Sequence, residues 1–238
     1  MTILATIQTF CGRTGLPVPQ FVVGSQDTQV TQLLALANEL VEDLCDRWSW
    51  TVLTKEAVFT TVAGEDQGSI DTIAPDGFQR ILQETIFNRS LRLPLFGPLM
   101  AAQWQALKAL PTTGPFYKYR LRGGRLLFNP PGIAGQTCAF EYASSHAVLS
   151  LSGSGKPYFT ADTDELLLDE RLLQAGLRWR WKAEKGLDYS EEFRRYEELA
   201  NNAAGRDGTK PRIDMGGGGN DFRPGIWVPS GNWNLSTP

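Results

Sequence analysis

The stretch TADTDELLLDERLLQAGLRWRWKAEKG, residues 160–186, decides the fold because it predicts a helix that is apolar around much of its circumference. Asp162, Thr163 or Asp164 can cap its N-terminus, and Gly186 can end it. Its apolar side chains form two groups, Leu167, Leu168, Leu172, Ala175 and Trp179 on one side and Leu166, Leu173, Leu177 and Trp181 on another. A helix with a single neighbour needs only one apolar stripe, so we expect more than one neighbour to cover this helix.

Charged residues lie at both ends of the same stretch. Asp162, Asp164 and Glu165 favour the N-terminal end of a helix dipole, and the leucines that follow them do not fit a calcium-binding loop. The last turns carry four cations, which favour the C-terminal end of the dipole and can also pair with acidic groups on a neighbouring subunit: Arg178, Arg180, Lys182 and Lys185.

Other helices are predicted on both sides of this one. Asp188 and Glu191 form a capping box for a helix that we expect to stop at Gly205. Near the other end of the chain, Asp27 or Thr28 caps a helix that runs to about residue 47. Its apolar stripe recurs at intervals of three and four, with Val30, Leu33, Leu34, Ala37, Leu40, Val41 and Leu44.

A shorter helix is predicted over residues 2–12, ended by Gly12 and Gly15. Its inward side chains are Ile3, Leu4, Ile7, Phe10 and Cys11. Helices are therefore expected at both ends of the folded body.

The middle of the chain has the composition of strands and turns. WSWTVLTKEAVFTTV and FQRILQETIFN each predict a strand, and residues 98–109 predict a short helix. GPFYKYRLRGGRLLFNPPG predicts a hairpin with a Gly123-Gly124 turn and a Pro-Pro stop, and TCAFEYAS predicts a following antiparallel strand. The hairpin combines Lys118, Arg120 and Arg122 with tyrosines, as nucleic-acid platforms do. Because side chains alternate along a strand, the cations should share one face opposite the tyrosines, which favours a solvated sheet face or a subunit contact.

Together these patterns predict an α+β fold. We expect a helical bundle from the N- and C-terminal helices, with an inserted β-rich region and an extended C-terminal arm. The expected boundaries are 1–50 for the N-terminal helices, 51–160 for the β-rich insertion, 161–205 for the C-terminal helices and 206–238 for the arm.

The expected arm contains GGGGNDFRPGIWVPSGNWN, residues 216–234. Four glycines are typical of a linker, but large apolar side chains follow them at once, and exposed Trp and Phe side chains are unusual in flexible tails. We therefore expect four of these residues to bind a partner, Phe222, Ile226, Trp227 and Trp233. Two targets stay open, another chain or the helices of the same subunit.

Bulk composition excludes several classes of protein. The chain has 238 residues and a net charge of −3, which predicts neither a general nucleic-acid binder nor a binder of anionic membranes. No apolar run approaches the roughly 18 residues of a membrane span, and the first residues do not resemble a signal peptide. Cys11, Cys45 and Cys138 form no close pair, so we expect reduced thiols in a cytoplasm-like compartment. Cys11 and Cys45 fall on the apolar sides of predicted helices, where we expect them to be buried.

A search for catalytic motifs finds none that is complete. His146 has no nucleophile elbow to serve, and we interpret it as a solvent-facing loop residue. SGSGKPY, residues 152–158, departs from the phosphate-binding loop pattern at two positions and reads as a flexible connection. We therefore expect no catalytic residue, no cofactor and no metal site.

The order of four segments resembles a known family. The chain is similar to the head-to-tail adaptor (connector) proteins of tailed bacteriophages, particularly those of short-tailed phages, in the order of these segments. They are DRWSWTVL, then APDGFQRIL, then the hairpin with AFEYAS, and finally DELLLDERLLQAGLRWRWKAEKGLDYSEEFRRYEELA. The resemblance covers roughly residues 27–204.

The resemblance implies a non-enzymatic virion protein that is assembled in the host cytoplasm. Similar adaptors form a ring, commonly of twelve copies, beneath the portal, extend the DNA channel without binding DNA specifically, and present a platform for tail or nozzle proteins. Their C-terminal segment reaches the portal or an adjacent subunit as an arm. A tail-tube or baseplate protein is the alternative within the same class, and a cell-wall hydrolase is the alternative from a different class.

Overall fold

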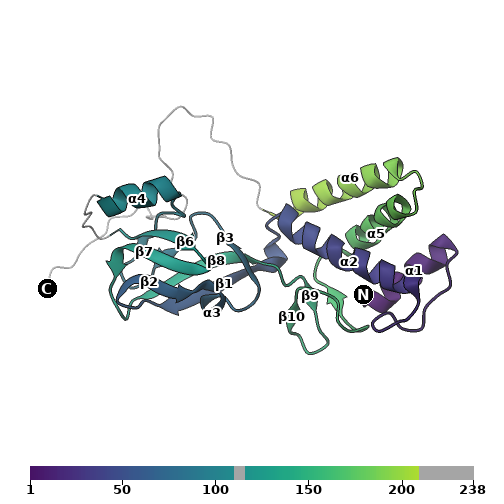
Figure 1. Cartoon of the computed structure of the whole chain (residues 1–238), viewed down its shortest axis with the longest axis horizontal. Coiled ribbons are helices and arrows are strands. Elements are labelled where there is room, and N and C mark those ends of the chain that lie inside the picture. Colours follow the sequence, from purple (N-terminus) through teal and green to yellow (C-terminus); the bar gives the residue numbers. More distant parts are fainter. Residues whose placement is uncertain (110–115, 209–238) are drawn as a thin grey trace, which may run out of the picture.

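The computed structural model describes residues 1–109 and 116–208 and has a helical part at one end and a β-rich part at the other (Figure 1). The helical part contains α1 (Ile3–Thr14), α2 (Thr28–Arg47), α5 (Glu170–Glu184) and α6 (Ser190–Asp207). The β-rich part contains the short helices α3 (Ile70–Ile73) and α4 (Ala101–Ala109) besides its strands. The predicted α+β class is therefore confirmed.

Helix α2 begins after Asp27, one of its two predicted caps, and α1 begins at Ile3, one residue after its predicted start. The Thr2 hydroxyl accepts a hydrogen bond from the backbone N–H of Ala5, and the Asp27 carboxylate accepts one from Gln29 at 2.8 Å. Gly15, with a φ of 69°, ends α1, which continues past Gly12 to Thr14.

The start of α5 differs from the prediction. The helix begins at Glu170, capped by the Asp169 carboxylate, which accepts a hydrogen bond from the backbone N–H of Arg171 at 2.9 Å. None of the residues 162–164 is its cap, because the chain before Asp169 runs as strand and turn, and Glu165 lies in strand β11 (Glu165–Leu166). The prediction was right about the end of the helix, since Gly186 follows it with a φ of 66°.

The two earlier aspartates hold loops together instead. The Asp162 carboxylate accepts hydrogen bonds from the backbone N–H groups of Val22 and Val23, at 3.1 and 2.7 Å, and so fixes the connector between α1 and α2. Asp164 is fully buried. Its carboxylate accepts hydrogen bonds from Thr160 N, Ala161 N and Lys156 Nζ.

Helix α6 is longer than predicted and starts one residue later than a cap at Asp188 would give. Tyr189 occupies the cap position without a side-chain hydrogen bond, while the Asp188 carboxylate accepts one from the backbone N–H of Ser190 at 3.0 Å. The helix continues past Gly205 to Asp207. The Asp207 carboxylate accepts hydrogen bonds from the backbone N–H and the hydroxyl of Thr51, at 2.7 and 2.8 Å. These bonds connect the end of α6 to the start of the β-rich part.

Helix α5 is the centre of the helical part, because it packs against α1, α2 and α6. This agrees with the expectation that several neighbours cover it. The buried core of this part draws on residues 3–53 and 147–200. Its largest fully buried side chains are Ile3, Ile7, Leu33, Leu40 and Leu44.

Two antiparallel sheets form the β-rich part. The first has the order β1-β8-β4-β5, with β3 also pairing β8, and the second has the order β2-β7-β6. The strands are β1 (Thr54–Thr60), β2 (Gly64–Ser69), β3 (Phe78–Ile81), β4 (Phe87–Asn88), β5 (Leu93–Pro94), β6 (Lys118–Arg122), β7 (Arg125–Gly132) and β8 (Thr137–Ser144). A second core, drawn from residues 57–142, contains Tyr119, Phe128, Phe140 and Tyr142.

The predicted hairpin is β6–β7, and its turn residues Gly123 and Gly124 have φ values of 57° and 69°. The Pro-Pro stop is wrong, because Pro130 and Pro131 remain inside β7. The pairing of β7 with β2 shifts register across this stretch, so the prolines lie in a bulge where no ladder N–H is required.

Two further segments differ from their predictions. FQRILQETIFN forms two short strands, β3 and β4, rather than one. SGSGKPY is not a flexible connection: it contributes the turn and strand β10 (Gly155–Lys156) of a third sheet, with β9 (Val148–Leu149) and β11 in the order β10-β9-β11. Val148 of this sheet belongs to the helical core.

Candidate interaction surfaces

Three of the four cations predicted near the end of α5 have partners within the chain. Arg180 is buried and pairs with Glu39 at 2.7 Å and with Asp43, both on α2. Lys182 pairs with Glu192 of α6, and Lys185 donates a hydrogen bond to Gln32 at 2.9 Å. Arg178 differs from them, because it forms no ion pair with any described residue.

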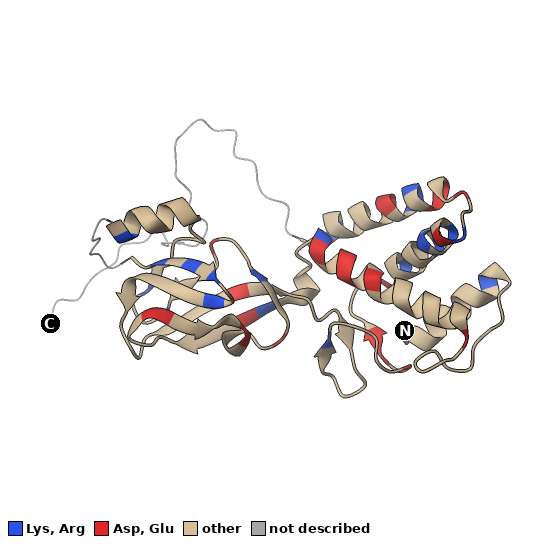
Figure 2. Ribbon diagram, viewed as in Figure 1, with Lys and Arg blue, Asp and Glu red and all other residues tan. Residues whose placement is uncertain are grey.

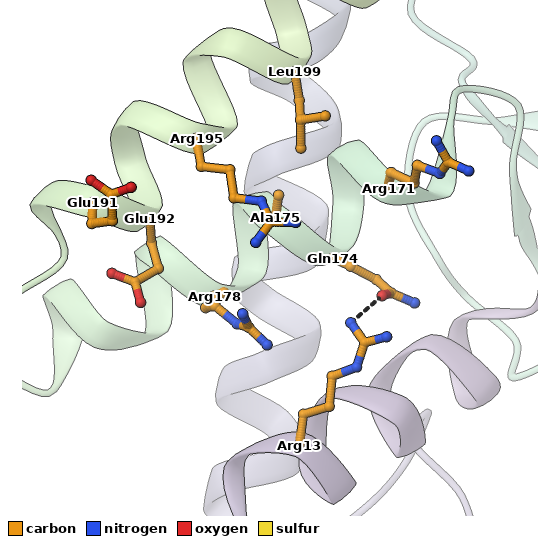
Figure 3. A pocket seen from close by; sticks show the side chains of 9 residues that line it. All are labelled: Arg13, Arg171, Gln174, Ala175, Arg178, Glu191, Glu192, Arg195 and Leu199. Carbon is orange, nitrogen blue, oxygen red and sulfur yellow. Dashed lines mark hydrogen bonds between the residues drawn. The ribbon is translucent and has the colours of Figure 1, made fainter.

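Arg178 lies in an open cleft of about 480 Å³ between α1, α5 and α6 (Figure 3). The cleft contains four guanidinium groups, those of Arg13, Arg171, Arg178 and Arg195. Its other lining residues are Gln174, Ala175, Glu191, Glu192 and Leu199. We call this surface the arginine cleft.

The arginines of the cleft are largely free of internal partners. Arg13 donates one hydrogen bond to Gln174 at 3.0 Å. Within residues 1–109 and 116–208, Arg171, Arg178 and Arg195 form no ion pair and no side-chain hydrogen bond. The two carboxylates of the cleft are already engaged, since Glu191 pairs with Arg194 and Glu192 with Lys182. The arginine cleft therefore presents unsatisfied positive charge.

An acidic row lies on α2. Glu39, Glu42, Asp43 and Asp46 follow one another at helical intervals of three and four, so they share one face of the helix. Figure 2 shows acidic residues along α2 and basic residues on α5 and α6. All four acidic residues are exposed, although Glu39 and Asp43 pair with Arg180. We call this surface the acidic row.

An aromatic cluster adjoins Arg180 where α5 meets α6. The Trp179 ring contacts Tyr189, Phe193 and Tyr196, with ring centroids 5.2 to 6.2 Å apart, and the Arg180 guanidinium lies 5.0 Å from the Trp179 ring. Tyr189 and Phe193 keep 43% and 40% of their surface exposed. Exposed aromatics beside charged groups are typical of protein–protein contacts.

The hairpin cations lie as predicted. Tyr117 and Tyr119 are buried, whereas Lys118, Arg120 and Arg122 point away from the core. Arg125 pairs with Asp66 at 2.5 Å, and that bond is the main reason that the pKa of Asp66 lies below its ordinary value.

His146 is half-buried rather than solvent-facing. Its ring lies so close to Gly77 that a Cβ at this position would overlap it. Burial, followed by the charge of Lys55, lowers the pKa of His146. Among the described residues no group of three His, Cys, Asp or Glu side chains is placed to hold a metal ion, and no helix is both long and apolar enough to cross a membrane.

All three cysteines are buried, which confirms the prediction for Cys11 and Cys45. Burial raises the pKa of the Cys45 and Cys138 thiols to about 11, and it also raises that of Cys11. The arm residues Phe222, Ile226, Trp227 and Trp233 lie outside the described residues.

A comparison with protein families matches residues 1–220 to the SU10 adaptor protein family. The chain belongs to this family. The adaptor is thus a structural protein of bacteriophages, and the family implies a non-enzymatic role in the virion and association with portal and tail components. No curated protein matches the adaptor's sequence.

Of the four arginines of the cleft, sequence reasoning singled out Arg178 and missed the other three. Arg171 and Arg178 are seven residues apart on α5 and share a face, which is a signal that helical periodicity could have supplied. Arg13 and Arg195 come from other helices. Only the packing of α1 and α6 against α5 brings them to the same cleft.

Proposed function

We propose that the adaptor is a subunit of a ring, commonly of twelve copies, that attaches beneath the portal and joins the head to the tail of a short-tailed phage. The observation that carries the proposal is the family match over residues 1–220. In this role the protein extends the DNA channel at the head–tail junction, after assembly in the host cytoplasm.

The division into two parts supports this role. A ring subunit must contact its neighbours, the portal above and the tail or nozzle proteins below, so it needs several separate surfaces. The helical part offers the arginine cleft and the acidic row, and the β-rich part offers the basic face of β6 at the other end of the molecule (Figure 2). One subunit can therefore engage different partners at its two ends.

The net charge fits a passage for DNA better than a binding site. A wall that neutralises many phosphates binds DNA tightly and slows its movement. The chain has 23 Lys and Arg against 26 Asp and Glu, which gives the net charge of −3. We expect DNA to pass through the lumen without specific binding.

The C-terminal segment serves as the attachment arm in this proposal. Because α6 continues to Asp207, the predicted arm loses its first two residues, and the remaining residues 208–238 could extend to roughly 100 Å at about 3.3 Å per residue, enough to cross a subunit boundary. Burial of each large aromatic contributes about 2 to 3 kcal/mol, whereas ordering the backbone costs about 1 to 2 kcal/mol per residue. The anchors Phe222, Ile226, Trp227 and Trp233 thus need added backbone hydrogen bonds, as when a strand joins a partner's sheet.

The direct experiment mixes the purified protein with its cognate portal and images the complex by electron microscopy. We expect a ring of adaptor copies on the portal. A monomer in isolation is compatible with the proposal, because the portal can template the ring. Portals that stay bare at saturating adaptor concentration, with and without tail proteins, would contradict it.

A further inference from the structure

The two sides of α5 differ in whether their arginines have ion-pair partners within the chain. Arg178 and Arg180 are two residues apart, which turns their side chains about 200° from each other around the helix. Arg180 points to α2 and pairs with its acidic row, while Arg178 points into the arginine cleft between α1 and α6. Figure 3 shows the cleft side chains on the near side of α5, with α2 passing behind.

The arginine cleft has the chemistry of a carboxylate receptor. A guanidinium offers parallel N–H donors that bind a carboxylate through two hydrogen bonds, and Arg171, Arg178 and Arg195 have no ion-pair partner among the described residues. The carboxylates Glu191 and Glu192 do not fill this role, since Lys182 and Arg194 occupy them. A ligand with several carboxylates on one rigid surface would satisfy the cleft.

The acidic row of α2, on the other side of α5 from the cleft, supplies such a surface. Glu42 is exposed and forms no ion pair with a described residue, and Asp46 is exposed and accepts one hydrogen bond from Gln79. Glu39 and Asp43 leave 60% and 59% of their side chains exposed, so their free lone pairs can accept further donors. The exposed rings of Tyr189 and Phe193 adjoin this row through Trp179 and Arg180.

We propose that adjacent copies of the adaptor pack through these two surfaces, with the arginine cleft of one copy on the acidic row and aromatic cluster of the next. The inference rests on the proposed ring and names its subunit contact. Because the two surfaces are different and lie on opposite sides of α5, the contact repeats from copy to copy by rotation, as a ring requires. Arginines can bind the carboxylates and also stack on the exposed rings.

The test uses charge reversal on the full-length protein and its cognate portal. A cleft variant carries Arg178→Glu and Arg195→Glu, and a row variant carries Glu42→Lys and Asp46→Lys, which leaves the buried Arg180 pairs intact. A fourfold variant carries all four substitutions, restores complementarity and has the wild-type net charge. Circular dichroism and thermal unfolding check that each variant folds.

We expect the cleft variant and the row variant each to reduce the fraction of portals that carry a closed ring by about ten-fold or more, as counted by electron microscopy and native mass spectrometry. The fourfold variant should restore rings to within about two-fold of the wild-type protein. A control with Arg89→Glu and Arg92→Glu, two exposed cations between β4 and β5 that belong to none of the proposed surfaces, has the same change in charge as the cleft variant and should form rings normally.

Other outcomes overturn the inference. Normal rings from the cleft variant mean that the cleft binds something else, such as nucleic acid. Loss in the cleft variant without recovery in the fourfold variant assigns the cleft to the portal. Equal loss in the control with Arg89→Glu and Arg92→Glu means a general charge effect. If the wild-type protein itself forms no ring, the proposed function fails and this contact fails with it.

Discussion

Gly176 of α5 lies directly against the side chain of Leu40 of α2, so that a Cβ at this glycine would overlap both methyl carbons of the leucine. The contact sets how closely the two central helices of the helical part approach. Overpacking by Gly176→Ala should cost about 1 to 3 kcal/mol, against a gain of about 1 kcal/mol in helix propensity, so the net effect should be a destabilisation of up to about 2 kcal/mol. Urea unfolding measures the free energy.

The matched control for this substitution is Gly12→Ala in α1. A Cβ at Gly12 meets no atom within 4 Å, so the change should be neutral or stabilising by up to about 1 kcal/mol. Equal effects at the two glycines would contradict the close approach of α5 to α2.

Loss of both ion-pair partners of Arg180 should lower the free energy of unfolding by more than the sum of the two single losses. Either Glu39→Gln or Asp43→Asn alone leaves the buried guanidinium one carboxylate, and each should cost about 1 kcal/mol. The double variant leaves a buried charge unpaired and should cost about 3 kcal/mol or more, above the sum of the single changes. Strict additivity in urea unfolding would show that Arg180 does not depend on the pair.

Asp164 should contribute stability that depends on pH. Burial by itself raises the pKa of this carboxyl, but hydrogen bonds from Thr160, Lys156 and Ala161 outweigh burial and hold the pKa below its ordinary value of 3.8. A lowered pKa in the folded state stabilises the protein above the ordinary value, and the contribution is lost as the pH falls through the lowered one.

Asp164→Asn tests this dependence. It should cost about 1 to 3 kcal/mol at pH 7, because the buried ion pair with Lys156 is lost, and the difference from the wild-type protein should shrink below about pH 4. Unfolding free energies at pH 7, 5 and 3.5 measure the difference. A cost that stays constant over this range would contradict a charged Asp164.

The three cysteines should be inert in the folded protein. Their burial and raised pKa values keep the thiols protonated at pH 8, and thiolate is the reactive form. We expect a chromogenic disulfide reagent to titrate none of them in native buffer and all three in denaturant. A rapid reaction in native buffer would show that one of the sites opens readily.

The elements that sequence reasoning predicts well are those with local determinants. The cap at Asp27, the stripe of α2 and the Gly123-Gly124 turn each depend on residues a few positions apart. The start of α5 could not be predicted in this way, because Asp162 and Asp164 are as suitable for capping as Asp169. Their hydrogen bonds to the α1–α2 connector and to the loop before β11 arise only after the chain has folded.

The candidate site shows the same division. Helical spacing predicts that Arg171 and Arg178 share a face, but it does not predict which cations find internal partners. Arg180 is neutralised by α2 and Arg178 is not, since the two residues point to opposite sides of α5. Surface charge that is available to a partner is therefore a property of the packed helices rather than of the sequence pattern.

The attachment arm can be tested by a deletion whose boundary the structure defines. The Asp207 carboxylate accepts two hydrogen bonds from Thr51, and removal of residues 209–238 keeps them. Removal of residues 206–238 loses them and should lower the free energy of unfolding by about 1 to 2 kcal/mol. We expect the shorter deletion to keep the circular dichroism spectrum and melting temperature of the intact protein but to weaken binding to the portal at least ten-fold. Trp227→Ala with Trp233→Ala should weaken it in the same direction, because both rings are proposed anchors. Full portal binding by the shorter deletion would contradict the arm, and loss of its folding would instead favour docking of the tail on the subunit's own helices.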